Sequence, residues 1–299
     1  MFLRNAFFFA VGIGFLGLAK AKNILRGYTT PRAFDHSDAE RSIDYDFQVV
    51  EQWLVHLVNY TGNSRYLRDK NVLELGPGPD LGIGVLLLSM GAATYNACDV
   101  HDLAGGSSDS FYGALFRRIK SINAGADVER LARTLHSALN GEPGELNYVV
   151  RDDFDLVAAF GDAAIDVVFS QAAFEHFDDV ETTIKRLTAV CRPGAVIVAE
   201  IDLQTHSRWI RRKDPNNIYR YPNALYDLFR FRGSPNRVRP YRYRELFERH
   251  GWTNVITTAL SSLDGRSNGM SGLSGRFADG VNQMDQLTVL LCATKSRSS

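Results

Sequence analysis

The sequence predicts an α/β protein whose mostly parallel sheet is covered by helices on both faces. Short apolar runs at 71–75, 94–100, 146–150 and 165–171 alternate with segments of helical periodicity, which is the pattern of repeated strand–helix–strand units. The runs are almost continuously apolar, and this is typical of strands that are buried on both faces.

The first helix of this α/β fold is predicted at 38–60, because Phe47, Val50, Trp53 and Leu57 recur at helical spacing. The other elements are expected in this order: a linker at 23–37, a helix at 81–92, a helix within 111–138, a helix at 178–191, a turn at 192–194, a strand at 195–203, a helix at 242–250, and a final pair of strands at 252–260 and 286–294. Between the last two strands, the Gly/Ser-rich stretch 261–280 is expected to be a mobile loop.

The composition is that of an ordinary globular chain. Its 299 residues can form one α/β domain with additions or two small domains. The 34 basic and 34 acidic residues give a formal net charge of zero, so the overall balance predicts no polyanionic partner. Cys98, Cys191 and Cys292 lack the C-x-x-C spacing, which predicts reduced, buried thiols and no metal site.

The N-terminal segment, residues 1–25, is treated separately from a domain expected at 26–299. Its uncharged run of 14 residues, 6–19, follows Arg4 and precedes Lys20. A bilayer core needs about 20 apolar residues, so the run is short for a full span. Three interpretations remain open: a helix that is mobile or packed on the protein, a membrane-surface or anchoring segment, and a cleaved signal.

The loop after the first predicted strand, G-P-G-P-D-L-G, is the strongest indication of a binding site. Gly76 and Gly78 carry no Cβ, so a ligand can approach the main chain where the next helix begins. A dinucleotide-binding loop needs G-x-G-x-x-G, but Leu81 stands where the third glycine belongs. The strand also carries Glu74 near its end, and a carboxylate there suits a cationic amino group better than a pyrophosphate.

This combination resembles motif I of class I S-adenosylmethionine-dependent methyltransferases, and the resemblance continues along residues 70–205. Asp99 follows Gly78 by 21 residues, and "VVRDDF", "IDVVFSQAAFEHFDD" and "VCRPGAVIVAEIDL" are similar to later motifs of the family. The resemblance implies a Rossmann-like, seven-stranded sheet with an antiparallel last strand, and S-adenosylmethionine as cofactor. It implies ribose binding by Asp99 and adenine binding by Asp152, with Asp153 as a substitute. The full set of expected cofactor-binding residues is Glu74, Gly76, Pro77, Gly78, Asp99, Val100, Asp152, Asp153, Ser170 and Gln171.

The catalytic candidates follow the fourth and fifth strands. Methyl transfer to a hydroxyl needs alignment and removal of one proton. His206, His176 and Asp202 are the candidate groups, with His206 the preferred base because an imidazole titrates near neutrality. Glu175 is read as a support for its loop, and each of the other three could also have a purely structural role.

A basic and aromatic segment at 204–249 is expected to shape the acceptor site. Between 208 and 249 lie twelve basic and four acidic residues, interleaved with nine aromatic ones. Arginine forks bind phosphate or carboxylate, and aromatic faces stack on sugars or bases. Some of these charges are expected on a solvated face, and Arg237 and Arg239 are candidates for structural partners. The basic residues are Arg208, Arg211, Arg212, Lys213, Arg220, Arg230, Arg232, Arg237, Arg239, Arg242, Arg244 and Arg249.

Taken together, these features predict methylation of a small molecule, a glycan or sugar phosphate, at oxygen. The segment 200–252 loosely resembles methyltransferases of bacterial surface-polysaccharide gene clusters, which implies work in the cytoplasm, with attachment to the inner face of a membrane through residues 1–22. An RNA methyltransferase is the first alternative, because basic and aromatic residues also suit single-stranded nucleic acid. A non-catalytic cofactor-binding module and a nucleotide-cofactor oxidoreductase are the others.

Overall fold

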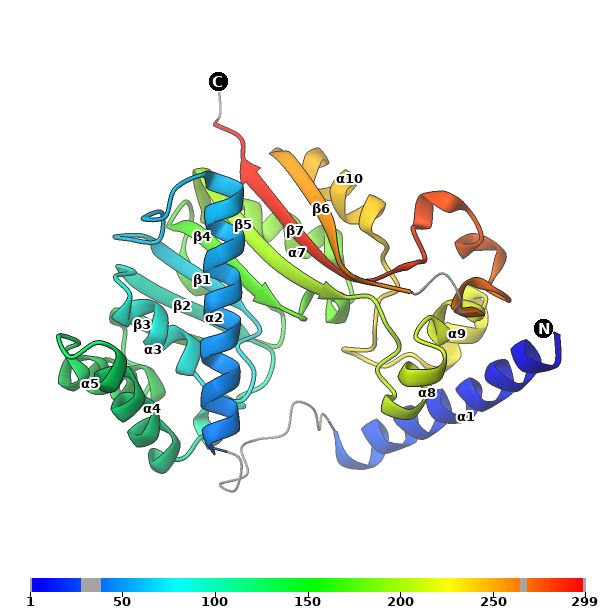
Figure 1. Cartoon of the computed structure of the whole chain (residues 1–299), viewed down its shortest axis with the longest axis horizontal. Helices are drawn as coiled ribbons and strands as arrows, with labels where there is room; N and C mark the ends of the chain where they lie inside the picture. The colour runs from blue at the N-terminus through cyan, green and yellow to red at the C-terminus, as the bar shows by residue number, and fades with distance from the viewer. Residues whose placement is uncertain (1, 28–38, 264–267, 298–299) are drawn as a thin grey trace. The chain divides into compact units, whose positions relative to one another are not determined.

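The structure is a computed structural model and describes residues 2–27, 39–263 and 268–297. Within these residues seven strands form one sheet in the order β3-β2-β1-β4-β5-β7-β6, and β7 alone is antiparallel (Figure 1). This confirms the predicted Rossmann-like fold. The strands are β1 (Asn71–Leu75), β2 (Thr94–Asp99), β3 (Leu146–Val150), β4 (Ile165–Gln171), β5 (Cys191–Asp202), β6 (Trp252–Ser262) and β7 (Gln286–Lys295).

Strand β1 lies between β2 and β4 and runs parallel to both. Glu74 is opposite Ala97 on one side and Phe169 on the other. The strand order reverses next to β1, and an open α/β sheet binds its ligand at the carboxyl ends of the strands at such a point. The glycine loop therefore stands where the fold provides a crevice.

Ten α-helices are seen in the described part of the chain, and short 3₁₀ turns join several of them. The helices are α1 (Phe2–Arg26), α2 (Ala39–Thr61), α3 (Gly82–Ser89), α4 (Asp109–Ile122), α5 (Val128–Leu139), α6 (Leu156–Phe160), α7 (Val180–Val190), α8 (Arg208–Lys213), α9 (Asn223–Phe229) and α10 (Pro240–Arg249). The 3₁₀ turns are η2 (Ala104–Gly106), η3 (Phe174–His176), η4 (Asn217–Arg220), η5 (Asn268–Met270), η6 (Gly275–Phe277) and η7 (Gly280–Asn282).

The chain divides into two compact units, which are described one at a time. Unit 1 comprises Met1–Thr29, Ala172–Thr182 and Glu200–Leu291, and unit 2 comprises Thr30–Gln171, Thr183–Ala199 and Cys292–Ser299. Unit 2 therefore contains the glycine loop, and unit 1 contains the basic segment.

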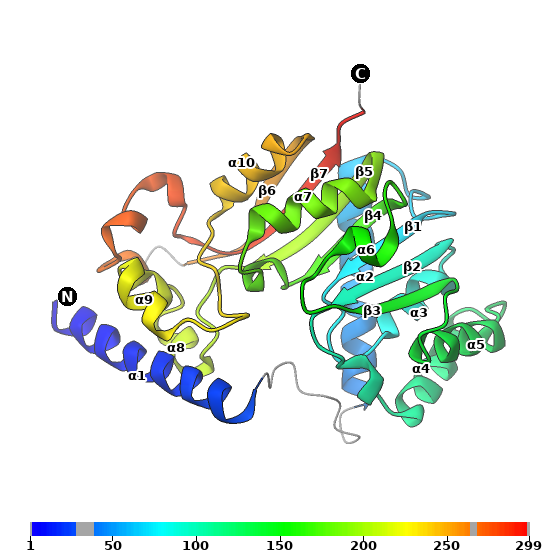
Figure 2. The ribbon, with the colours of Figure 1, turned by 180° about the vertical axis from the view of Figure 1, so that it is seen from behind.

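Unit 2 is a sheet with helices on both faces. Figure 1 shows α2 across one face of β1 and β4, and Figure 2, turned by 180°, shows α6 and α7 on the other. Helix α2 buries a stripe that includes Trp53, whose ring stacks on Phe169 of β4 with centroids 4.7 Å apart. The predicted amphipathic helix at 38–60 is thus confirmed, and its apolar face closes the core over the central strands.

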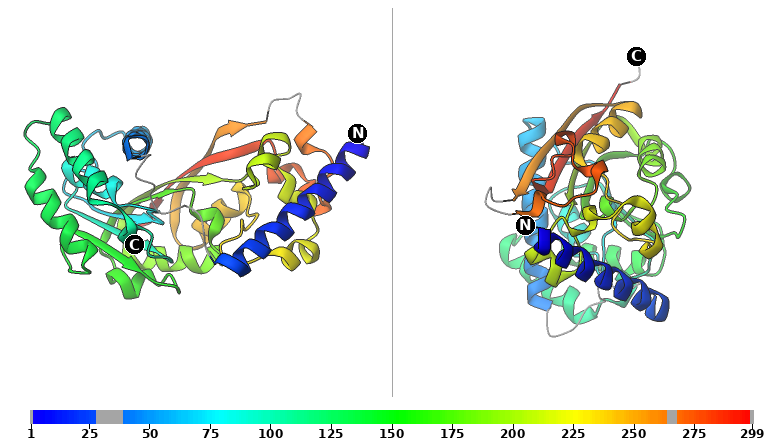
Figure 3. Two further views of the ribbon diagram at one scale, coloured as in Figure 1. Left: turned by 90° about the horizontal axis from the view of Figure 1, so that it is seen from below. Right: turned by 90° about the vertical axis from the view of Figure 1, so that its right-hand side faces the viewer.

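Unit 1 contains α1, which runs beside α9 (Figure 3). Its contact with η4 is close, because an added Cβ on Gly12 would lie 1.9 Å from Tyr221 Oη and 2.0 Å from the side-chain oxygen Oδ1 of Asn217. Asn217 also donates to the Phe8 carbonyl at 2.9 Å. Helix α1 is the one helix among the described residues that is long and apolar enough to cross a membrane.

Three arginines of the basic segment are buried in unit 1. Arg220 forms an ion pair with Asp214, and both side chains are at most 3% exposed. Arg237 donates to the Ile218 and Tyr221 carbonyls, and Arg239 donates to three carbonyls at 282, 283 and 286. The structural partners expected for Arg237 and Arg239 are confirmed, since these guanidinium groups satisfy loop carbonyls that strands and helices leave free.

Four sequence predictions need correction. The helix expected within 111–138 is two helices, because Asn123–Gly125 interrupts it and Asp127 caps α5 through the Arg130 N–H. The turn expected at 192–194 is part of β5, with Gly194 at a φ of 84°. The linker at 23–37 begins later, since α1 continues to Arg26; its residues 28–38 lie outside the described part. The loop at 261–280 contains the end of β6 and two short 3₁₀ turns; its residues 264–267 lie outside the described part.

Candidate functional site

The glycine loop adopts a backbone that only glycine accommodates without strain. Gly76 and Gly78 have φ angles of 71° and 80°, in the left-handed region that other L-residues rarely adopt. The Gly76 N–H donates to the Cys98 carbonyl at 2.9 Å, which ties the loop to the end of β2. The loop thus leaves β1 as a tight turn in which the two glycines place no side chain over their own main chain.

Asp99 lies against this loop, as the sequence analysis requires. Its carboxylate accepts from the Gly78 N–H at 3.4 Å, from the Val100 N–H at 2.7 Å and from the His101 N–H at 3.1 Å. Burial raises the pKa of Asp99, and these three N–H groups oppose that rise. The structure therefore brings Gly78, Asp99 and Val100 together and fixes the orientation of the carboxylate.

Glu74 is fully buried beneath the loop and has carboxylates as neighbours. Tyr95 donates its hydroxyl hydrogen to Glu74 Oε2. Burial raises the pKa of Glu74 to about 8, the Tyr95 hydrogen bond lowers it in part, and the charges of Asp80 and Asp99 raise it further. No cationic side chain of the described residues is in contact with this carboxylate.

Two further acids, Asp46 and Asp80, complete what we call the loop acid cluster: Glu74, Asp80 and Asp46. Asp80 accepts from the Gly82 N–H at 2.8 Å at the start of α3. Asp46 comes from α2, and its Oδ2 is buried without a hydrogen-bond partner among the described residues. Burial is the main cause that raises the pKa of both carboxyls. The cluster suits a ligand that brings a positive charge.

Asp46 was not identified as a site residue from the sequence, although a signal for it exists. It lies three residues from Ile43 and from Val49, within the stripe that α2 buries. A carboxylate in an otherwise apolar stripe needs a partner or a function. Asp80 precedes Leu81 in the glycine loop, and the structure gives it a contact with the start of α3.

The remaining cofactor candidates differ in their surroundings. Asp152 and Asp153 are both exposed, and the Arg151 guanidinium holds the pKa of Asp153 at about 2. Gln171 accepts from the Trp53 indole at 3.0 Å. Ser170 is fully buried, and its hydroxyl has no hydrogen-bond partner in the described chain.

The catalytic candidates of unit 1 form a compact group that also includes Glu175, and the group is named here the Glu-His cluster: Glu175, His176 and His206. The rings of His176 and His206 have centroids 4.7 Å apart, and a ligand atom from each of the three residues lies within 4.8 Å of the others. Asp202 Oδ2 is 3.6 Å from His206 Nε2, and it also binds the Arg211 guanidinium. The predicted group of His176, Asp202 and His206 is therefore assembled in one place.

The two histidines are neutral at pH 7 by their surroundings. Burial lowers the pKa of His176, and burial followed by the charge of His176 lowers that of His206. His176 Nδ1 is 2.6 Å from the Gly233 carbonyl, which can only accept, so this nitrogen carries the proton and Nε2 is a free acceptor. A neutral imidazole with a free nitrogen can take a proton or bind a cation.

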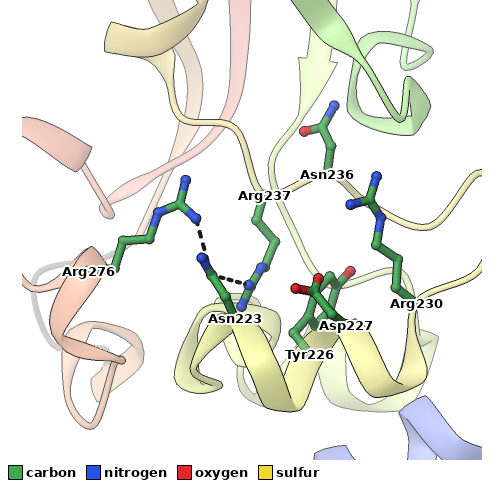
Figure 4. Close-up of a pocket in the computed structure, with 7 residues that line it drawn as sticks. All are labelled: Asn223, Tyr226, Asp227, Arg230, Asn236, Arg237 and Arg276. Carbon is green, nitrogen blue, oxygen red and sulfur yellow. Dashed lines mark hydrogen bonds between the residues drawn. The ribbon is translucent and has the colours of Figure 1, made fainter.

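A polar pocket in the basic segment of unit 1 carries an excess of positive charge. Figure 4 shows Arg230 and Arg276 on opposite sides of it, with Asn223, Tyr226 and Asp227 of α9 between them. Arg237 lies over the Tyr226 ring with its guanidinium carbon 4.0 Å from the centroid. Three arginines face one aspartate in this lining, so the pocket suits an anionic group.

Comparison with known protein families gives one match. Residues 101–199 match a family model described as a methyltransferase domain. This segment covers about a third of the chain; it begins after the glycine loop and contains β3, β4 and most of β5. The comparison with curated protein sequences gave no match.

Solved structures with a similar arrangement include three methyltransferases. The CurJ carbon methyltransferase is 14% identical, with 77% of this chain and 50% of that chain covered and a TM-score of 0.42. Haemonchus contortus phosphoethanolamine N-methyltransferase 2, in complex with S-adenosyl-L-methionine, is 13% identical, with 83% and 53% covered and a TM-score of 0.45. A putative sarcosine dimethylglycine methyltransferase from Galdieria sulphuraria is 15% identical, with 86% and 87% covered and a TM-score of 0.44. The chain spans about half the length of the first two, and none of the three carries an argument about its acceptor.

Proposed function

We propose that this chain, whose residues 101–199 match a methyltransferase domain, uses S-adenosylmethionine to methylate a small anionic molecule, a glycan or sugar phosphate, at oxygen. When bound, the cofactor supplies a methyl group on a positively charged sulfur, which an acceptor oxygen can displace in line. The observation that carries the proposal is the glycine loop, with Asp99 held against Gly78 above three buried acids that lack a cation.

Within unit 2 we assign the cofactor's parts to the residues that match their chemistry. Asp99 offers two acceptor oxygens to the vicinal ribose hydroxyls. The loop acid cluster offers negative charge to the amino group of the methionine part, and the unpartnered Asp46 Oδ2 supports this. Asp152, or Asp153 in its place, is assigned to the adenine amino group, although both are exposed.

Within unit 1 we assign proton removal to the group of His206, His176 and Asp202. His206 is neutral at pH 7 and can accept the proton of an acceptor hydroxyl, but burial lowers its pKa to about 4, so it is a weaker base than the free imidazole that the sequence analysis assumed. Asp202 is assigned the orientation of His206, because its Oδ2 lies 3.6 Å from Nε2. The same oxygen accepts from Arg211, and Oδ1 accepts from the Gln204 N–H at 3.1 Å. The arginine pocket around Arg230, Arg237 and Arg276 supports an anionic acceptor.

The cofactor assignment is tested by calorimetric titration with S-adenosylmethionine, S-adenosylhomocysteine and NAD. We expect the first two to bind and NAD not to bind. Asp99→Ala removes two charge-assisted hydrogen bonds of about 1.5 kcal/mol each, so affinity should fall roughly a hundredfold. Asp109→Ala, an exposed acid in the first turn of α4, is the matched control and should bind as wild type. Equal affinity of Asp99→Ala and wild type would exclude the assigned ribose contact.

The acceptor is tested by screening sugar phosphates, neutral saccharides and short RNA for methyl incorporation. We expect product from sugar phosphates, and slower turnover in His206→Ala, whereas His250→Ala, whose ring faces Glu181 on the surface, should retain full turnover. Methylated RNA with binding that weakens steeply with salt would instead favour the RNA methyltransferase.

We further propose that α1 contacts an anionic membrane surface while it stays packed on unit 1. Only Phe8 and Gly12 of α1 are buried, whereas Leu3 and Leu25 are each 82% exposed. Co-sedimentation of the full chain with anionic vesicles should be lost in the Leu3→Glu/Leu25→Glu variant. It should persist in Leu139→Glu, which alters an exposed leucine of α5. Equal sedimentation of both variants would refute the contact.

A further inference from the structure

The Glu-His cluster of unit 1 has a feature that a proton-transfer role leaves unexplained. Glu175 is 3% exposed, and neither of its carboxylate oxygens has a hydrogen-bond partner among the described residues. A buried carboxylate without a partner costs several kcal/mol by ordinary estimates unless it is neutralised. Burial raises the pKa of Glu175 well above its usual range, and the backbone N–H groups of Glu175 and Asp202, which lie near the carboxyl without forming a hydrogen bond, oppose this only in part.

The neighbours of this carboxylate are nitrogen ligands and not ammonium or guanidinium groups. His176 and His206 each bring a ring nitrogen within 4.8 Å of a Glu175 oxygen. Among the described residues, one guanidinium group lies beside these side chains, that of Arg211. It is bound to Asp202. An ionised Glu175 would therefore have no counter-charge among the described residues.

His176 is held in the way that metal-binding histidines usually are. A ligating imidazole generally donates its other N–H to a carbonyl or a carboxylate, which fixes its orientation. His176 does this through Nδ1 to the Gly233 carbonyl, whereas Asp202 Oδ2 lies 3.6 Å from His206 Nε2, beyond hydrogen-bond distance. Two imidazoles and one carboxylate form a ligand set that zinc and other first-row divalent ions occupy with an open position.

We infer that Glu175, His176 and His206 form a binding site for a first-row divalent transition-metal ion. Ligands of a tetrahedral ion at about 2.0–2.1 Å from the metal lie roughly 3.4 Å apart, so the three atoms must approach each other by roughly 1 Å. His206 can provide this movement, since its side chain is 31% exposed. Imidazole ligands favour zinc, copper, iron or nickel over magnesium and calcium.

The inference deepens the proposed function and rests on it for the role of the ion. The ion would bind the acceptor hydroxyl at its open position and increase the acidity of that hydroxyl. The proton then leaves to water, the O–CH₃ bond forms as the S–CH₃ bond breaks, and S-adenosylhomocysteine departs. In this arrangement His206 acts as a ligand, and the ion replaces it as the group that activates the hydroxyl.

The test uses the full chain, freed of metal with a chelator and titrated with Co²⁺, whose visible absorption reports nitrogen and oxygen ligands. We expect one Co²⁺ per chain, displaced by one equivalent of Zn²⁺. Glu175→Gln and His206→Ala should each weaken binding by more than roughly a hundredfold, since even residues that only support ligands are worth 10–100-fold. His250→Ala removes an imidazole that faces a single carboxylate, and it should bind as wild type.

Absence of stoichiometric Co²⁺ binding to the wild-type chain would overturn the inference, and so would unchanged binding in His206→Ala. If Glu175→Gln fails to fold, as judged by circular dichroism, His206→Ala still decides, because that ring is partly exposed. Calorimetry with S-adenosylmethionine on the same metal-free sample separates the two proposals. Cofactor binding and methyl transfer without the ion would leave the proposed function standing and remove the metal.

Discussion

The molecule contains buried carboxylates in two different settings, and the contrast shows what each is suited to bind. In unit 2 the loop acid cluster places Glu74, Asp80 and Asp46 together, with a tyrosine hydroxyl and a backbone N–H as donors. In unit 1 the Glu-His cluster places one carboxylate beside two imidazoles. Carboxylates alone suit an ammonium group, whose N–H groups donate to their oxygens, whereas imidazole nitrogens are ligands that zinc and other first-row transition metals prefer.

A buried acid that lies outside both clusters gives the reference for them. Asp214 is as buried as Glu74 and Glu175, but Arg220 binds both of its oxygens, at 2.6 and 3.0 Å. Its charge is compensated within the protein. Burial of a carboxylate in this chain therefore does not by itself mark a binding site. The absence of a counter-charge does mark one.

The largest expected effect comes from removing the counter-charge of Asp214. Arg220→Met leaves a buried carboxylate without compensation and should lower the free energy of unfolding by about 3–5 kcal/mol. Arg230→Met is the matched control, since the Arg230–Asp178 pair is 37% and 42% exposed and is worth at most about 1 kcal/mol. Urea denaturation measures both. Similarly small losses of unfolding free energy in both variants would show that Asp214 needs no arginine. The contrast between Asp214 and the two clusters would then not hold.

A smaller effect is expected from the pH dependence that Glu74 imposes. Its folded-state pKa of about 8 lies above the unfolded value of 4.5, so the folded chain holds the proton more strongly. The free energy of unfolding should therefore fall as pH rises from about 4.5 to 8, by at most about 1.4 kcal/mol per pH unit for this group.

Glu74→Gln should flatten this slope, because the amide keeps an acceptor for Tyr95 and does not ionise. Glu129→Gln, in the exposed first turn of α5, is the control and should leave the curve as in wild type. The measurement is the urea midpoint at pH values between 4.5 and 8.5. A wild-type slope that persists in Glu74→Gln would assign it to another group.

The fold and the glycine loop could be predicted because their signals are local in the sequence. Strand β1 was placed at its observed bounds from a short, mostly apolar run, and Gly76 and Gly78 marked the loop that follows it. The break between α4 and α5 was missed, because the apolar periodicity continues across Asn123–Gly125 and only the cap by Asp127 marks a new helix.

The partners of buried groups could not be predicted, because they depend on contacts between distant residues. The contact of Asp46 with the region of Asp80 joins residues far apart in the sequence. The count of arginines in the basic segment predicted charge at an acceptor site, but Arg220, Arg237 and Arg239 are used by the fold. Glu175 was read as a loop support, since its missing partners become visible only in the folded structure.

The smallest expected effect separates the two clusters by their donors. Tyr95 is the hydroxyl donor to Glu74, and its hydrogen bond lowers the pKa of that carboxyl. Tyr95→Phe should cost about 1 kcal/mol and should shift the fall in stability to higher pH, because the pKa of Glu74 rises further. Tyr148→Phe loses a hydrogen bond to the His101 carbonyl and is the control for the cost alone. It should lower stability without moving the pH at which the fall occurs. If both variants shift that pH equally, Tyr95 does not lower the pKa of Glu74. The loop acid cluster would then depend on a bound ligand alone to compensate its charge, as Glu175 does.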